Sequence, residues 1–260
     1  MANSLEKFEL HGKTAVVLGA SRGLGRRMAF ALAEAGADLV VASRSLKPLE
    51  ELAEEIRALG REVYAAECDV ARVEDCERLL RSALERFKRV DILINAAGTI
   101  LRKPSQEVTV EEWERIMAVN LKGMFFACKV FGAHMMAQGG GKIINIASLA
   151  SELALPERAL YGISKAGVLA LTKALALEWA RCKINVNAIG PGYFETELTA
   201  PLLADKEWRR RLLRKIPLGR IGQPEDLDGI TVFLASSASD YVTGQIFYID
   251  GGFLAGEIEL

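Results

Sequence analysis

Short apolar runs alternate with helical patterns along almost the whole chain, and this alternation is the feature that most constrains its fold. Parallel strands need a crossover segment between them, usually a helix, so the alternation is typical of a parallel sheet. The sequence therefore predicts an α/β fold with helices on both faces of the sheet. The predicted strands are 14–18, 38–43, 62–67, 91–96, 142–147, 183–188 and 245–249. The predicted helices are 24–35, 46–59, 73–87, 110–138, 159–181 and 225–235.

Length and composition predict one domain, 1–260. The chain has 260 residues, 50% of them apolar, which is enough for one sizeable core. The net charge of −1 gives no reason to expect binding to nucleic acid or to an anionic membrane. We see no signal peptide, and no apolar run approaches the length of a membrane span.

Cysteine and histidine usage indicates a reducing compartment and no metal. The four cysteines form no Cys-x-x-Cys pair, and the two histidines lie far apart in the sequence. Reduced thiols are typical of the cytoplasm, where we expect the protein to be. A structural zinc site needs four converging ligands, which this sequence does not indicate.

A glycine-rich sequence follows the first predicted strand. Thr14 to Leu18 runs into Gly19-Ala-Ser-Arg-Gly23-Leu-Gly25, and a helical pattern comes next. Glycines in such a turn let the backbone approach a pyrophosphate, which the helix N-terminus attracts. The spacing differs from the commoner Gly-x-Gly-x-x-Gly fingerprint. A dinucleotide site is one interpretation, and an ordinary tight strand-to-helix turn is the other.

The end of the second predicted strand carries information about the cofactor. An acidic residue there normally binds the ribose 2′-hydroxyl of NAD, whereas an Arg suits the 2′-phosphate of NADP. Here Ser43 takes the acidic position, Arg44 follows it, and Arg22 lies inside the glycine loop. Two guanidinium groups that could converge on one phosphate predict NADP(H). The alternative is that Arg44 merely begins a solvated helix.

The sequence from Gly141 to Lys165 points to an enzyme. A buried strand pattern ends at Ser148, and Tyr161-Gly-Ile-Ser-Lys165 then opens a helical pattern, with Lys165 one turn beyond Tyr161. A free phenol titrates near about 10. A nearby ammonium would lower that pKa and make Tyr161 a usable acid or base, with Ser148 hydrogen-bonding a substrate oxygen. The alternative is a surface Tyr and Lys on an amphipathic helix.

Together, these sequences resemble the short-chain dehydrogenase/reductase family over nearly the whole chain. The resemblance implies a single-domain, doubly wound (Rossmann-type) sheet of seven strands with ligands at its carboxyl edge. The sequence departs from the family pattern at Leu18, where many members have Thr, and at Ala96, which replaces an Asn. The residues that match the catalytic tetrad are Asn120, Ser148, Tyr161 and Lys165. The residues that the resemblance assigns to the cofactor are Gly19, Ser21, Arg22, Gly23, Leu24, Gly25, Ser43, Arg44, Asp69, Val70, Asn95, Ala96, Gly98, Tyr161, Lys165, Pro191, Gly192 and Thr196.

The family resemblance implies an oxidoreductase that interconverts a secondary alcohol and a ketone. Tyr161 would exchange a proton with the substrate oxygen, and Ser148 would hold that oxygen. Lys165 would lower the pKa of Tyr161 and bind the nicotinamide ribose. Asn120 would position a water that relays protons through Lys165.

Within the family, the most similar members are gluconate 5-dehydrogenases and related sugar-acid dehydrogenases, so we expect a sugar acid as substrate. Arg102 and Lys103 are candidates to bind its carboxylate, with Arg158 and Arg209 as competitors. An ordinary solvated loop around Arg102 is the alternative. The resemblance places a substrate lid at 193–219. The candidate substrate contacts are Ser148, Tyr161, Arg102, Arg158 and Tyr193.

Two other functions stay open. A 3-oxoacyl-[acyl-carrier-protein] reductase or another carbonyl reductase would share the tetrad and the preference for NADP. A non-catalytic dinucleotide-binding regulator would share only the fold. In similar proteins two long helices, here 110–138 and 159–181, pair across a dimer axis, so we expect a homodimer or homotetramer.

Overall fold

The computed structural model describes residues 4–197 and 199–256, whose strands form one seven-stranded sheet in which every neighbouring pair is parallel. The strand order is β3-β2-β1-β4-β5-β6-β7, so the chain winds outward from β1 in one direction and from β4 in the other. This confirms the predicted doubly wound α/β fold. The strands are β1 (Thr14–Leu18), β2 (Asp38–Ser43), β3 (Val63–Glu67), β4 (Ile92–Asn95), β5 (Gly141–Ile146), β6 (Ile184–Pro191) and β7 (Ile246–Ile249).

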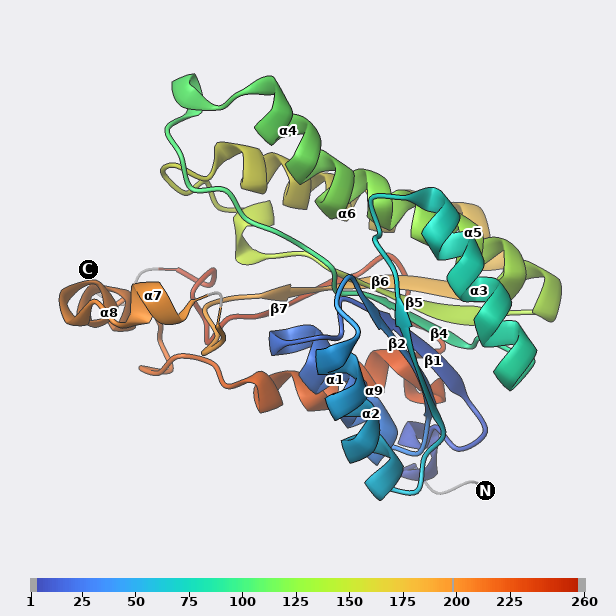
Figure 1. Cartoon of the computed structure of the whole chain (residues 1–260). Helices are drawn as coiled ribbons and strands as arrows, with labels where there is room; N and C mark the ends of the chain where they lie inside the picture. Colours follow the sequence, from blue (N-terminus) through green and yellow to red (C-terminus); the bar gives the residue numbers. More distant parts are fainter. Residues whose placement is uncertain (1–3, 198, 257–260) are drawn as a thin grey trace.

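Helices cover both faces of the sheet (Figure 1). Successive side chains of a strand point to opposite faces, so Val17 and Val41 join one core, whereas Val16 and Val40 join the other. Burial on both faces explains why the strands read as continuous apolar runs. The helices of the first face are α1 (Gly23–Glu34), α2 (Lys47–Ala58) and α9 (Asp228–Ala235). Those of the second are α3 (Val73–Phe87), α5 (Met124–Gln138) and α6 (Ala159–Trp179), with α4 (Val110–Met117) preceding α5.

Two predicted helices differ from the structure, and two further helices lie in the region that the resemblance assigned to a lid. The predicted helix 110–138 is interrupted by a π-helical segment, Ala118–Gly123. The predicted helix 225–235 begins at Asp228, because Pro224–Leu227 forms a 3-10 turn. The region 193–219, of which residue 198 lies outside the described part, contains two short helices, α7 (Ala200–Leu203) and α8 (Lys206–Leu213).

The expectation that no apolar run approaches a membrane span was wrong. By length and composition alone, Val110–Gln138 and Ala159–Cys182 are apolar enough to cross a membrane. Only 44% of the most apolar window of each is buried in the chain. Both helices are therefore apolar on the side that faces the sheet and partly apolar on the outer side as well.

Candidate active site

The glycine loop after β1 lies directly against the segment that follows β4, at the point where the strand order changes direction. Gly19 has a φ of +86°, and a Cβ there would lie 2.5 Å from the Ala97 nitrogen. A Cβ at Gly25 would lie 2.3 Å from the Gly19 carbonyl oxygen. No side chain caps the first turn of α1, so its N–H groups are left for a ligand. This cradle fits the pyrophosphate of a dinucleotide.

Tyr161 and Lys165 lie in the first turns of α6, and Ser148 lies just beyond the end of β5. The Lys165 Nζ is 5.9 Å from the centroid of the Tyr161 ring and donates a 2.7 Å hydrogen bond to the Ile146 carbonyl oxygen. The Ser148 hydroxyl lies next to the Tyr161 phenol and acts to lower the pKa of that phenol. The Ser148 Oγ also accepts the Ala150 N–H at 3.1 Å. The structure thus brings together Ser148 and Tyr161, which handle the substrate oxygen in the predicted mechanism, and Lys165, which assists Tyr161 there.

Burial has the largest effect on both ionisable groups of this cluster. It raises the pKa of Tyr161, although the Ser148 hydrogen bond and the charge of Arg158 act in the opposite direction. It lowers the pKa of Lys165 to about 8. The expected lowering of the Tyr161 pKa by Lys165 is therefore wrong in this structure, because desolvation of the phenolate dominates and the ammonium is directed at Ile146. At neutral pH the phenol is protonated.

Asn120 lies in the π-helical segment and is completely buried. Its Oδ1 accepts the Thr99 N–H at 2.8 Å, and its Nδ2 donates to the Thr99 carbonyl oxygen at 2.9 Å and to the Ser164 Oγ at 3.0 Å. A Cβ on Gly98 would lie 3.6 Å from both the Asn120 Oδ1 and the Lys165 Nζ. The fourth tetrad residue therefore lies beside the other three, but its side chain is occupied by protein contacts.

The two arginines predicted to bind a 2′-phosphate are both exposed. Arg44 follows β2 and precedes α2, so it does not begin a helix. Arg22 forms an ion pair of 3.3 Å with Glu197, a residue that the sequence did not indicate. Ser43 is buried, and its hydroxyl donates to the Ser45 carbonyl oxygen at 3.0 Å. No carboxylate stands at the end of β2 to bind a ribose 2′-hydroxyl.

The polar residues after β3 and β4 have distinct partners. The Asp69 Oδ1 accepts the Ala71 N–H at 3.1 Å, and this hydrogen bond orders the turn that contains Val70. Asn95 is 2% exposed, and its Nδ2 donates to the Asn145 Oδ1 at 2.9 Å. The Asn95 Nδ2 is therefore part of a buried network, whereas its buried Oδ1 has no hydrogen-bond partner among the described residues.

The remaining predicted cofactor residues lie around the glycine loop. A Cβ on Gly23 would lie 3.8 Å from the Thr196 side chain, which places the turn after β6 next to the glycine loop. Ser21 and Leu24 are half-buried in that loop. Ala96 packs against Gly25, since a Cβ there would lie 3.1 Å from the Ala96 Cβ. Pro191 is buried at the end of β6, and Gly192 follows it against Asp250.

The guanidinium groups of Arg102 and Arg158 lie close enough for their charges to interact, and the charge of Arg158 also acts on Tyr161. Partial desolvation and then the charge of Arg158 lower the pKa of Arg102. Arg158 also donates a 3.3 Å hydrogen bond to the Tyr193 hydroxyl. Within residues 4–197 and 199–256, neither arginine forms an ion pair with a carboxylate. The pair is a ready binding site for an anion.

The other two cationic candidates are already paired. The Lys103 Nζ lies 3.0 Å from the Glu112 Oε2, and Glu112 also closes the capping box of α4 with Thr109. The Arg209 Nη2 lies 3.4 Å from the Glu195 Oε1. Of the four candidates for the substrate carboxylate, the structure therefore leaves Arg102 and Arg158.

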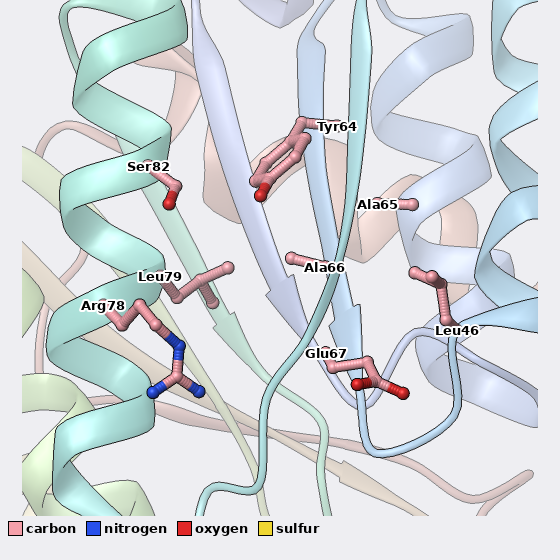
Figure 2. A pocket seen from close by; sticks show the side chains of 8 residues that line it. All are labelled: Leu46, Tyr64, Ala65, Ala66, Glu67, Arg78, Leu79 and Ser82. Carbon is pink, nitrogen blue, oxygen red and sulfur yellow. The ribbon is translucent and has the colours of Figure 1, made fainter.

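A cavity of about 350 Å³ lies elsewhere, along the edge strand β3 (Figure 2). Tyr64 and Glu67 come from the strand, Leu79 and Ser82 come from α3, and Leu46 comes from the loop before α2. None of the tetrad residues lines this cavity. Its chemistry is separate from that of the Tyr161 cluster.

Comparisons with known proteins agree with this geometry. A family profile described as Enoyl-(Acyl carrier protein) reductase matches residues 19–254. The chain is 44% identical to 2-dehydro-3-deoxy-D-gluconate 5-dehydrogenase of Escherichia coli, over 96% of this chain and 99% of that protein. It is 38% identical to a 3-oxoacyl-[acyl-carrier-protein] reductase of Synechocystis, over 94% of this chain and 98% of that protein.

Among solved structures, a gluconate 5-dehydrogenase from Burkholderia cenocepacia in complex with NADP and tartrate superposes with a TM-score of 0.94. It is 40% identical, and the alignment covers 98% of this chain and 100% of that one. The profile match, the relatives at this identity and coverage, the sheet order and the clustered tetrad lead to the same conclusion. The chain belongs to the short-chain dehydrogenase/reductase family of oxidoreductases.

Proposed function

We propose that the protein interconverts a secondary alcohol and a ketone on a sugar acid, with NADP(H) as its cofactor. The main support for this substrate class is the guanidinium pair of Arg102 and Arg158. Arg158 acts on both Tyr161 and Arg102, and neither arginine has a carboxylate partner among the described residues. A substrate carboxylate would neutralise both charges. Relatives named for gluconate and for 2-dehydro-3-deoxy-D-gluconate support this proposal.

The residues present fit a dinucleotide. The glycine cradle and the uncapped N-terminus of α1 would hold the pyrophosphate, and Thr196 would lie beside the nicotinamide end. Arg44 and Arg22 would bind the 2′-phosphate, which explains why no carboxylate is needed after β2. The bound cofactor would supply the hydride chemistry. NADP in the solved structures of similar proteins supports this choice.

This chain's own residues would hold the substrate oxygen and move its proton. The hydroxyls of Tyr161 and Ser148 would both bind that oxygen, since the Ser148 hydroxyl lies next to the phenol and acts on its pKa. The protonated phenol would donate to the oxygen during reduction and receive the proton back during oxidation. Lys165 would place a positive charge beneath the phenol, and Asn120 would hold the backbone next to it.

The test compares D-gluconate with D-glucitol, which has a neutral CH₂OH in place of the carboxylate, using NADP as oxidant. Arg102→Ala and Arg158→Ala should each raise the KM for D-gluconate roughly tenfold or more, because a charge-assisted hydrogen bond contributes about 1.5–3 kcal/mol. Neither variant should change the KM for the neutral polyol, and kcat should be largely intact because this contact is used equally in ground and transition states. The matched control is Lys103→Ala, because the Lys103 ammonium lies in the same loop as Arg102 but is already paired with Glu112.

Three outcomes would count against the proposal. Equal effects on acid and polyol would remove the carboxylate role of the two arginines. Much faster reduction of an acetoacetyl thioester than of any keto sugar acid would favour a 3-oxoacyl-[acyl-carrier-protein] reductase, consistent with the similar protein of Synechocystis. NADPH binding without turnover of any substrate would indicate a regulator.

The same proposal includes a homodimer or homotetramer in the cytoplasm, without nucleic-acid or membrane partners. Large apolar side chains on the outer sides of α4, α5 and α6 support assembly, and the four free thiols suit a reducing compartment. We take 1–260 as one domain and 193–219 as its substrate lid. The exposed apolar residues on these helices are Val110, Trp113, Phe125, Ile163 and Leu177.

A further inference from the structure

Ser164 links the π-helical segment that carries Asn120 to the first turn of α6, which carries Tyr161. It is completely buried and lies between Tyr161 and Lys165 in the chain. Its hydroxyl donates to the Tyr161 carbonyl oxygen at 2.7 Å and accepts from the Asn120 Nδ2 at 3.0 Å. An aligned chain of hydrogen bonds thus runs from the Asn120 amide through Ser164 to the backbone of Tyr161.

The Asn120 amide uses both of its N–H donors in this arrangement. One goes to Ser164 and the other to the Thr99 carbonyl oxygen, while the Oδ1 accepts the Thr99 N–H. Since the side chain is fully buried, an N–H that loses its acceptor finds no water to replace it. The position of Asn120 therefore depends on Thr99 and Ser164 together.

Asn120 needs such an anchor because it lies in a π-helical segment. The wide turn of Ala118–Gly123 has poorer packing than an α-helix and is retained mainly where it serves a function. Gly98 lies between Asn120 and Lys165, with its Cβ position 3.6 Å from a polar atom of each. A shift of Asn120 would therefore displace Gly98 in the loop after β4 and change the surroundings of the Lys165 Nζ.

We propose that Ser164 is a positioning residue for the reaction: its hydroxyl holds Asn120 and the π-helical segment at a fixed distance from the first turn of α6. Ser164 has no exposed surface and touches neither substrate nor cofactor. It acts on the rate through the geometry of Asn120, Tyr161 and Lys165, where small displacements are costly.

The same helix supplies a matched control. Thr172 is also completely buried in α6, donates to the Val168 carbonyl oxygen at 2.8 Å and accepts from the Asn145 Nδ2 at 3.0 Å. It repeats the Ser164 arrangement two turns farther along, away from Tyr161. Removal of either hydroxyl leaves one buried amide N–H without an acceptor, so both changes should lower the Tm by a few degrees.

The experiment measures kcat, KM and the NADPH dissociation constant of Ser164→Ala and Thr172→Val. We expect kcat to fall about tenfold in Ser164→Ala alone, with KM and NADPH binding within twofold of the parent in both variants. The substrate rests on the proposed function, so D-gluconate is used first. If the parent is inactive on sugar acids, that proposal fails and an acetoacetyl thioester replaces D-gluconate, which leaves the role of Ser164 testable.

A double-mutant cycle with Asn120→Ala separates positioning from general loosening. Ser164→Ala should slow the Asn120→Ala enzyme by less than twofold, because the group through which Ser164 acts is gone. An equal loss in both backgrounds, or a loss in Thr172→Val as large as that in Ser164→Ala, would overturn the proposal. Should Ser164→Ala fail to fold, Ser164→Cys keeps the size, replaces a strong acceptor by a weak one and is put through the same cycle.

Discussion

Tyr161 and Lys165 have pKa values shifted in opposite directions by one cause, the loss of water around them. Burial favours the neutral phenol and the neutral amine. The Tyr161 phenol is therefore protonated and able to donate its proton. Lys165 keeps its positive charge only up to about pH 8. Reduction of a ketone has its proton donor in place at neutral pH, whereas oxidation needs the phenolate.

The first prediction at the residue scale concerns the proton donor. Tyr161→Phe keeps the ring and removes the hydroxyl, so turnover should fall by about 10²–10⁴ while NADPH still binds. Steady-state kinetics and a fluorescence titration with NADPH check the two parts. Turnover within a few-fold of the parent would show that Tyr161 is not the proton donor.

The second residue-scale prediction concerns stability and pH. The pKa of Lys165 in the folded protein is about 8, below the ordinary 10.5, so between these values the unfolded chain binds a proton that the folded one has released. Stability of the parent relative to Lys165→Met should therefore be lowest below pH 8 and rise as the pH approaches 10.5, by roughly 3 kcal/mol at most. Denaturant unfolding at pH 7 and pH 10 measures the difference. The exposed Lys47→Met is the control, and a pH-independent difference would contradict the shift.

Most of the site was predictable from short sequences whose residues are close in the chain. The glycine loop and the Tyr161–Lys165 pair depend on one turn or one helix face, and the structure places them as predicted. Ser164 and Glu197 were not predictable, because their partners Asn120 and Arg22 lie 44 and 175 residues away. The pKa of Tyr161 was missed because burial cannot be judged from spacing.

At the scale of elements, the π-helical segment shows where periodicity stops being informative. One wide turn in 29 residues barely changes the apolar pattern, so 110–138 is indistinguishable from a continuous helix in the sequence. The early 3-10 turn at Pro224 has a local reason, since Pro lacks the N–H that an α-helix would use beyond its first turn. Tertiary contacts therefore determine where the π-helical segment forms, whereas the local chemistry of Pro224 determines where α9 begins.

The glycine loop and the end of β2 give a prediction on cofactor choice. Arg44→Ala and Arg22→Ala should each weaken NADPH binding by roughly 1.5–3 kcal/mol and leave NADH binding nearly unchanged, because only NADPH carries the 2′-phosphate. Equilibrium titrations with both cofactors measure this. Arg26→Ala is the control, because Arg26 lies in the first turns of α1 but is paired with Glu55 at 2.8 Å. Equal losses for both cofactors would mean that Arg22 and Arg44 serve the pyrophosphate or the fold.

For the whole molecule, the alternation of strands and helices was sufficient to predict a parallel sheet with two covered faces. The order of the strands was not predicted, because nothing local distinguishes the edge strand β3 from a central strand. The sequence also did not show which sides of α5 and α6 are exposed. An all-apolar helix can be buried by its own chain or by another copy.

The assembly gives the prediction at this scale. Leu177 is 82% exposed on α6, so Leu177→Asp should cost little in the isolated chain but should disrupt packing of α6 against a second copy. Sedimentation velocity should show a smaller species than the parent. Leu59→Asp, which is 42% exposed at the end of α2 on the other face of the sheet, should leave the assembly intact. If Leu177→Asp sediments like the parent, the interface does not include this face of α6.

The ion pair between Arg22 and Glu197 joins the glycine loop to the segment after β6, where the proposed lid begins. Both side chains are about 70% exposed, so the pair contributes little free energy and is easily exchanged. In the proposed cofactor site, a 2′-phosphate that binds Arg22 would replace Glu197 as its partner. Because this exposed pair is weak, exchanging it for a phosphate would cost little, so one arginine can serve both the proposed lid and the proposed cofactor site in turn.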